Sequence, residues 1–103
     1  MPQAGPTWRN QAAYKKGKAL QQMGRTDEAL TVFYDVLDKN TAGDRETFWL
    51  AKAGFDAAGL LEGRQQWKNA VAVYEKMARV PGPHVAQARQ RIKTLQLSRY
   101  LWD

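Results

Sequence analysis

The sequence predicts an all-α protein of five helices, arranged as two helical hairpins followed by one further helix. Apolar residues recur at spacings of three and four through most of the 103-residue chain, and no stretch alternates for long enough to form a strand. Breaks containing glycine, proline or asparagine divide the chain into segments of helical length. A pattern of small, apolar, small and aromatic residues also recurs 41 positions later, in one copy as Gly17, Leu20, Ala29 and Phe33 and in the next as Ala58, Leu61, Ala70 and Tyr74.

The chain is expected to begin with a flexible flank over residues 1–6, which contain two prolines and a glycine. A single domain should then cover residues 7–103. Thr7 is a candidate N-cap for the first helix, because its hydroxyl can accept a hydrogen bond from a free backbone N–H. That helix should end near Met23, since Gly24 readily adopts the left-handed conformation that terminates helices. Its expected apolar stripe is Trp8, Ala12, Ala13, Leu20 and Met23.

The second helix should begin at Thr26 or Asp27, where carboxylates favour the positive end of the helix dipole. After a break at residues 40–44, a third helix is expected from about Asp44 to Glu62. The inward residues of these two helices should be Leu30, Phe33, Val36 and Leu37 in the second and Phe48, Ala51, Phe55, Ala58 and Leu61 in the third.

A second hairpin turn is predicted at residues 63–66, followed by a fourth helix from about Trp67 to Arg79. The segment Pro81-Gly82-Pro83 should end this helix, because proline cannot continue the backbone hydrogen bonds. A fifth helix is expected from about His84 to Leu101.

The charge of the chain is +6 and unevenly distributed. Residues 1–26 carry five basic side chains and no acidic one, residues 27–63 have a net charge of −5, and residues 64–83 and 84–103 each carry +3. Basic ends around an acidic middle indicate head-to-tail complementarity or an acidic partner rather than uniform adhesion to nucleic acid.

Composition sets the class of protein. The hydrophobic content of 44% and charged content of 25% are ordinary for a soluble globular domain, and no apolar run reaches the length of a membrane span. We expect a soluble chain without a secretory signal in this sequence, although a signal removed from a precursor stays open. The absence of cysteine excludes disulfides and leaves the compartment unknown.

The repeated pattern resembles the tetratricopeptide repeat (TPR), a helix–turn–helix unit of 34 residues. The matching positions are the small residues Gly17 and Ala58, the small residues Ala29 and Ala70, and the aromatic residues Phe33 and Tyr74. Ala13 and Gly54 replace a usual large residue, and the closing proline is missing at Thr41. The resemblance implies an α-α superhelix of two degenerate repeats, at about 8–41 and 44–82, with a capping helix at about 84–102.

Such domains bind peptides or proteins on the concave surface that the first helix of each repeat lines. The resemblance places nine residues there: Tyr14, Lys18, Gln21, Lys52, Phe55, Glu62, Arg89, Lys93 and Gln96. Four basic groups and two aromatic rings suit an extended peptide with acidic or C-terminal carboxylate groups. The alternative partner is nucleic acid, bound by the basic clusters Lys15-Lys16-Lys18 and Arg89-Arg91-Lys93-Arg99; a solvated basic face is favoured over it.

Catalytic and metal chemistry are not expected, and neither is a cofactor. Ser98 and His84 lie 14 residues apart on one expected helix, about 21 Å, so they cannot form a nucleophile–base pair. His84 is expected to be a solvated residue at a helix start. One histidine without cysteine is too few for a zinc site.

The C-terminal end of the fifth helix contains more large residues than one face can bury. Two interpretations stay open: a frayed tail folded on the capping helix, or a surface for a homodimer or for neighbouring repeats of a longer chain. The residues of such a self-association surface would be Leu97, Tyr100, Leu101 and Trp102.

Overall fold

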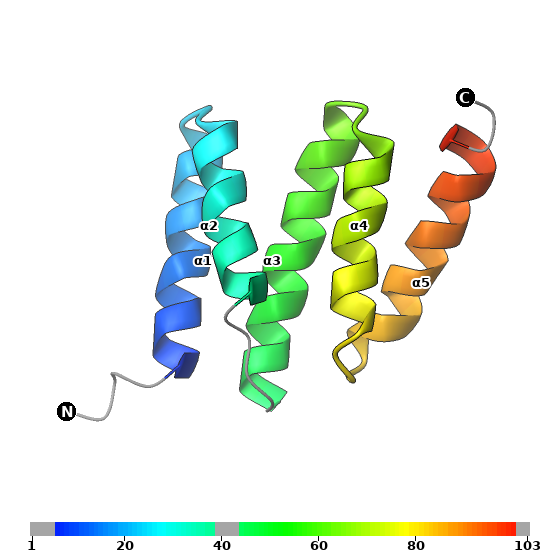
Figure 1. Cartoon of the computed structure of the whole chain (residues 1–103). Coiled ribbons are helices and arrows are strands. Elements are labelled where there is room, and N and C mark those ends of the chain that lie inside the picture. The colour runs from blue at the N-terminus through cyan, green and yellow to red at the C-terminus, as the bar shows by residue number, and fades with distance from the viewer. Residues whose placement is uncertain (1–5, 39–43, 101–103) are drawn as a thin grey trace.

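The computed structural model describes residues 6–38 and 44–100, with side chains at residues 9–38 and 47–98. Five α-helices stand side by side in chain order, and a π-helical turn continues the last of them (Figure 1). They are α1 (Pro6–Gln22), α2 (Thr26–Asp38), α3 (Asp44–Gly63), α4 (Trp67–Ala78) and α5 (His84–Leu95), followed by η2 (Gln96–Tyr100). Within the described ranges there is no strand, so the predicted all-α class of five helices is confirmed.

The helices form an open stack of two hairpins and a last helix. α1 pairs with α2 and α3 pairs with α4, while α3 also packs against both helices of the first hairpin. α1 and α5 lie at opposite ends of the row, and the molecule measures 53 × 32 × 15 Å along its principal axes (Figure 1). The arrangement is therefore not an up-and-down bundle closed around one central core.

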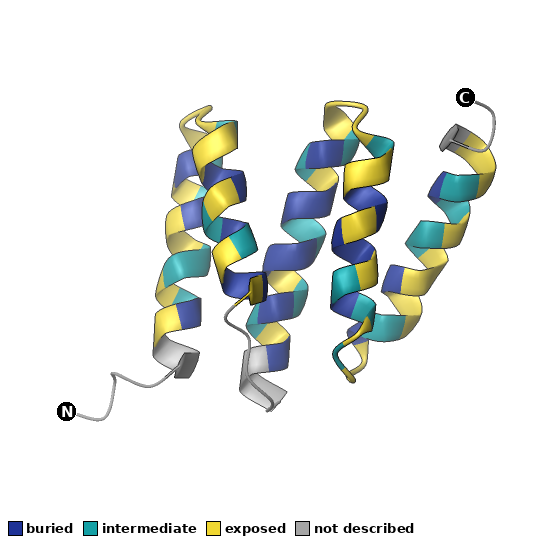
Figure 2. Cartoon of the chain, in the orientation of Figure 1, coloured by how far each residue is buried: buried dark blue, intermediate teal, exposed yellow. Residues whose placement is uncertain are grey.

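The small and aromatic residues of the repeated pattern lie where the helices of each hairpin touch. Ala29, Ala58 and Ala70 have no exposed surface, and Phe33 and Tyr74 are buried as well. Figure 2 shows buried residues along all five helices and exposed residues at the hairpin turns. A Cβ atom added at Gly17 would lie only 2.8 Å from Cδ1 and 3.0 Å from Cζ of Phe33. The absence of a side chain at Gly17 thus lets the ring fill the space between α1 and α2.

The two hairpin turns share one backbone geometry. In the first turn, the Gly24 N–H donates to the Gln21 carbonyl at 3.0 Å and the Arg25 N–H donates to the Leu20 carbonyl at 2.9 Å. In the second turn, the N–H groups of Gln65 and Gln66 donate in the same way to the carbonyls of Glu62 and Leu61, both at 2.9 Å. This is the Schellman motif, which needs one residue in the left-handed conformation. Gly24 takes that role with φ 79°, as predicted, whereas Gln65 takes it in the second turn with φ 61°. Gly63 still belongs to α3, so this turn begins one residue later than predicted.

Three further expectations about the helices are wrong. Helix α1 begins at Pro6, so Thr7 lies inside its first turn and not at its N-cap; proline fits there because the first helical N–H has no partner within the helix. Of the expected stripe, Leu20 is buried, but Ala12 is exposed on α1 and Met23 is exposed in the turn that follows the helix; the side chain of Trp8 lies outside the described residues. The last helix changes from α to π geometry after Leu95, beside a hydrogen bond from the Ser98 hydroxyl to the Thr94 carbonyl at 2.6 Å.

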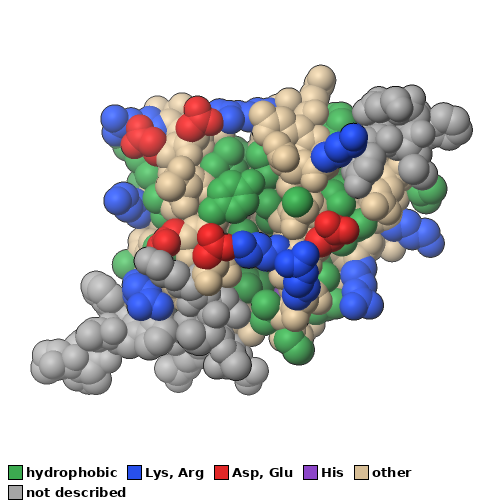
Figure 3. Space-filling view, in the orientation of Figure 1, with side chains coloured by type: hydrophobic (Ala, Val, Ile, Leu, Met, Phe, Trp, Pro, Cys, Tyr) green, Lys and Arg blue, Asp and Glu red, His purple; other side chains and the backbone are tan. Residues whose placement is uncertain are grey.

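Ion pairs between side chains of opposite charge join the two hairpins. Arg64 donates to the Asp27 carboxylate at 2.7 Å, and Lys76 pairs with Asp38. Acidic and basic side chains lie next to one another on the side that α2 and α4 present in Figure 3. The acidic middle of the sequence is therefore partly neutralised within the chain by basic residues of the second hairpin.

Candidate functional site

Aromatic rings and a lysine gather where α1 and α3 meet; we call Tyr14, Phe48, Trp49 and Lys52 the Lys52 cluster. The ring of Trp49 lies 5.5 Å from that of Tyr14 and 4.9 Å from that of Phe48, centroid to centroid. The Lys52 ammonium lies 5.6 Å from the centroids of both the Tyr14 and the Phe48 rings. These distances suit cation–π attraction, which holds the ammonium over the rings.

Helical spacing explains the cluster. Phe48 and Lys52 are four residues apart and share one side of α3, while Trp49 turns toward α1. Tyr14 approaches from α1 and is backed by the buried Phe33, whose ring centroid lies 5.8 Å away. Phe48 is 55% exposed and was expected in the core, so that expectation is wrong. Phe48, Lys52 and Phe55 recur at helical spacing, and this pattern could have placed Phe48 on the same side of the helix as the two predicted groove residues.

Asp56 holds the α1 side of this region in position. Its carboxylate accepts a hydrogen bond from the Tyr14 hydroxyl at 2.5 Å and lies 3.6 Å from the Lys18 ammonium. Burial raises the pKa of Tyr14 above its ordinary value, and the bond to Asp56 raises it further. Tyr14 is therefore a neutral donor at physiological pH, and much of the charge of Lys18 is balanced within the chain.

A second group joins α3, α4 and α5. The Glu62 carboxylate accepts a hydrogen bond from the Tyr74 hydroxyl at 2.6 Å and another from Arg91. Burial, followed by the bond to Glu62, raises the pKa of Tyr74 to about 12. Phe55 packs on the same ring, with centroids 6.0 Å apart. Phe55 and Glu62 thus contact the neighbouring helices as well as facing outward.

The nine predicted groove residues do not all come together. Tyr14, Lys18 and Lys52 lie close to one another, and Phe55 and Glu62 form the second group. Arg89 and Lys93 are exposed on α5, which packs chiefly against α4. The remaining two are half-buried: Gln96, which begins η2, and Gln21, whose Oε1 has no hydrogen-bond partner among the described residues.

The predicted self-association surface falls mostly outside the described residues. Leu97 is 55% exposed, in line with such a surface. The side chain of Tyr100 and all of Leu101 and Trp102 lie outside the part of the chain that the structure describes. Self-association through this end of the chain stays a prediction.

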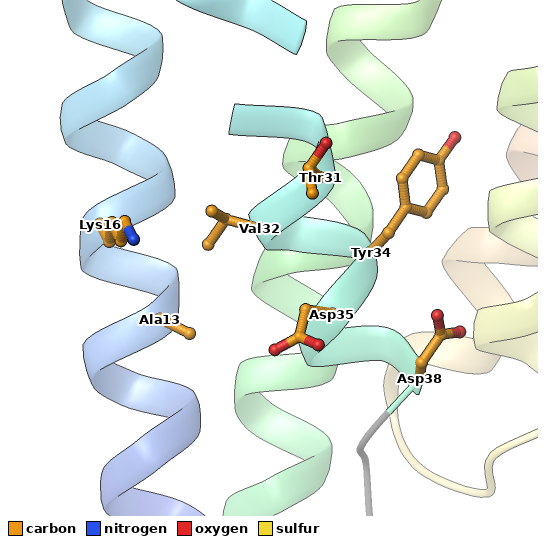
Figure 4. Close-up of a pocket in the computed structure, with 7 residues that line it drawn as sticks. All are labelled: Ala13, Lys16, Thr31, Val32, Tyr34, Asp35 and Asp38. Atoms are coloured by element: carbon orange, nitrogen blue, oxygen red, sulfur yellow. The ribbon is translucent and has the colours of Figure 1, made fainter. Parts of the chain in front are cut away.

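Two hollows occur on the described surface, and none of the nine residues lines either. One, of about 530 Å³, lies over α1 and α2 and is lined by Ala13, Lys16, Thr31, Val32, Tyr34, Asp35 and Asp38 (Figure 4). The other, of about 430 Å³, lies between the first turns of α3 and the loop before α5; its lining residues are Thr47, Phe48, Ala51, Pro81, Gly82, Pro83 and His84. We call the second one the loop hollow.

His84 is buried at the loop hollow, and not solvated as expected. It is 6% exposed, and its Nε2 lies 2.8 Å from the Met77 carbonyl oxygen. Because that oxygen can only accept, Nε2 must be the donor of this hydrogen bond. The histidine thus fastens the start of α5 to the end of α4, a role that the sequence pattern did not reveal.

The side chains of the described ranges include no cluster of three or more histidine, cysteine, aspartate or glutamate residues suited to a metal ion. No helix within these ranges is long and apolar enough to cross a membrane. No protein-family model, curated protein or solved structure matches the chain.

Proposed function

We propose that this protein is a non-enzymatic protein-interaction module that holds an acidic peptide segment across α1 and α3, at the Lys52 cluster. The observation that carries the proposal is the setting of Lys52. Its ammonium lies over two aromatic rings and meets no carboxylate among the described side chains. A cation held in this way can still pair with an external anion, and the exposed ring of Phe48 offers apolar contact beside it.

The surroundings of this site support a rigid platform. Tyr14 is fixed by its bond to Asp56 and by the buried Phe33 ring, so this wall of the cluster is ordered before a peptide arrives. Prior order lowers the entropy lost on binding. The two residues weighed for catalysis are both engaged elsewhere, His84 with the Met77 carbonyl and Ser98 with the Thr94 carbonyl.

Nucleic-acid binding through the basic helices is the competing function. Lys15 and Lys16 are exposed on α1, and Arg89 and Lys93 are exposed on α5. These two sets lie at opposite ends of the row of helices, with the acidic residues of α2 between them in the chain (Figure 1). The basic residues therefore form two separate patches, which favours the peptide hypothesis.

Charge reversal at two lysines separates the two functions. The probes are a fluorescein-labelled peptide, Ser-Asp-Trp-Asp-Ser, and a labelled single-stranded oligonucleotide, each followed by fluorescence anisotropy. Lys52→Glu should weaken peptide binding at least about tenfold, because one favourable charge contact becomes a repulsive one. Lys15→Glu is the matched control, since it changes the net charge equally on an exposed part of α1.

The outcome is decided by which lysine matters and by salt. The proposal requires that Lys52→Glu weakens peptide binding and Lys15→Glu does not. Equal losses with both variants, together with tight oligonucleotide binding that falls steeply between low and physiological salt, would show instead that the chain binds nucleic acid.

A further inference from the structure

The loop hollow lies directly beside the Lys52 cluster, because Phe48 belongs to both. The centroid of the Phe48 ring lies 5.6 Å from the Lys52 ammonium nitrogen. The same residue lines the hollow together with Ala51, Pro81 and Pro83. An apolar cavity and a cation therefore share one exposed aromatic side chain.

The walls of the hollow are held in place by close packing. A Cβ atom added at Gly82 would lie 2.7 Å from Cγ2 of Thr47 and 2.9 Å from the ring of His84, so the loop fits tightly against α3. The bond between His84 and the Met77 carbonyl fastens the other end of the loop to α4. Pro81 and Pro83 further limit the backbone. The hollow is thus preformed, and a guest would not have to order it.

Its size and lining select one kind of guest. A volume of about 430 Å³ falls at the small end of the range for ligand sites, enough for one large side chain with its backbone and too small for a helix. Most of the lining is apolar, which favours an aromatic side chain, the group that buries the most apolar surface. Lys52, whose ammonium lies over the Phe48 ring that lines the hollow, favours a carboxylate close to that side chain.

We propose that the loop hollow is the anchor pocket of the peptide site: it receives one aromatic side chain, while an adjacent carboxylate of the same peptide pairs with Lys52. This inference rests on the proposed function, since it names the sequence feature that the peptide must carry. A peptide with acidic residues alone would use only half of the site.

Filling the hollow tests the proposal. Ala51→Leu places extra carbon atoms in the hollow from a half-buried position on α3, and leucine is a good helix former. Ala72→Leu is the matched control, the same replacement at an exposed position of α4. Each variant is titrated with Ser-Asp-Trp-Asp-Ser and with Ser-Asp-Ala-Asp-Ser, and circular dichroism checks that both keep the native helix content.

The pocket predicts a specific pattern of affinities. The tryptophan peptide should bind the unmodified protein at least about tenfold more tightly than the alanine peptide, because only the former fills the hollow. Ala51→Leu should remove that difference, and Ala72→Leu should keep it. Equal binding of the two peptides, or full discrimination by Ala51→Leu, would overturn the anchor pocket. If Lys52→Glu still abolished binding in that case, the proposed function would stand without it, whereas no effect of Lys52→Glu would refute both.

Discussion

Replacing glycine by alanine at different places in the stack should have opposite effects on stability. Gly59 is exposed on α3, and a Cβ there would meet nothing within 4 Å, so Gly59→Ala should stabilise the protein by about 1 kcal/mol through helix propensity alone. Gly17 instead faces Phe33, which has no exposed surface. The added Cβ would force the ring to move, and overpacking of this kind costs about 1–3 kcal/mol.

The net effect at Gly17 follows from these two contributions. The second hairpin has Ala58 at the position equivalent to Gly17, and both Ala58 and Tyr74 are buried there, so a methyl group is compatible with such a hairpin once the ring adjusts. We therefore expect Gly17→Ala to lower the free energy of unfolding by about 1 kcal/mol once the gain in helix propensity is included. The free energies of unfolding of the two variants should thus differ by about 2 kcal/mol. In a domain of this size each kcal/mol shifts Tm by roughly 4–8 °C.

Thermal unfolding followed by circular dichroism measures both changes. Gly59→Ala should raise Tm and Gly17→Ala should lower it, and Phe33→Leu should relieve the cost of Gly17→Ala in the double variant. If Gly17→Ala raised Tm as much as Gly59→Ala did, the ring of Phe33 would not pack against Gly17. That result would contradict the packing of α2 on α1 described above.

Three further predictions concern the turn, the tyrosine network and the last helix. Gln65→Gly should stabilise the protein by about 1 kcal/mol in urea unfolding, because glycine adopts φ 61° without strain; no gain would mean that Gln65 is not left-handed. The pKa of Tyr74 is raised to about 12 from about 10 in the unfolded chain. The stability that the Tyr74 hydroxyl adds to the folded state is therefore complete below pH 10 and decreases as pH rises toward 12. Unfolding measured from pH 9 to 12 should therefore show a steeper loss than in Tyr74→Phe, and parallel curves would argue against the raised pKa. Arg91→Met should increase amide hydrogen exchange in α5 while leaving α1 and α2 protected, since Arg91 links α5 to Glu62 of α3; unchanged exchange would show that packing on α4 is sufficient.

The helices and hairpin contacts could be predicted because they depend on local patterns. Gly24, the paired small residues and the rings of Phe33 and Tyr74 each act within one hairpin, where spacing determines which residues meet. The second turn shows the limit of this reasoning. Gln65 takes the left-handed conformation because the same Schellman bonds form there, although its residue type gives no such signal.

The candidate site was harder to predict, because it depends on contacts between distant segments. Phe48 lies on a side of α3 that helical spacing allowed to be core, yet it is 55% exposed and lines the loop hollow together with Pro81 and Pro83. His84 looked like a solvated helix start, yet its hydrogen bond to Met77 buries it. Arg89 and Lys93 were grouped with α3 on the expectation of regular stacking, whereas α5 packs chiefly on α4.

The most direct test of the binding proposal is nuclear magnetic resonance of the ¹⁵N-labelled protein during titration with Ser-Asp-Trp-Asp-Ser. We predict chemical-shift changes concentrated at the indole N–H of Trp49 and at the backbone amides of Phe48 and Lys52, with α2 and the outer side of α5 unaffected. Changes confined to Lys15, Lys16 and Arg89, or no change at the Lys52 cluster at saturating peptide, would contradict the account.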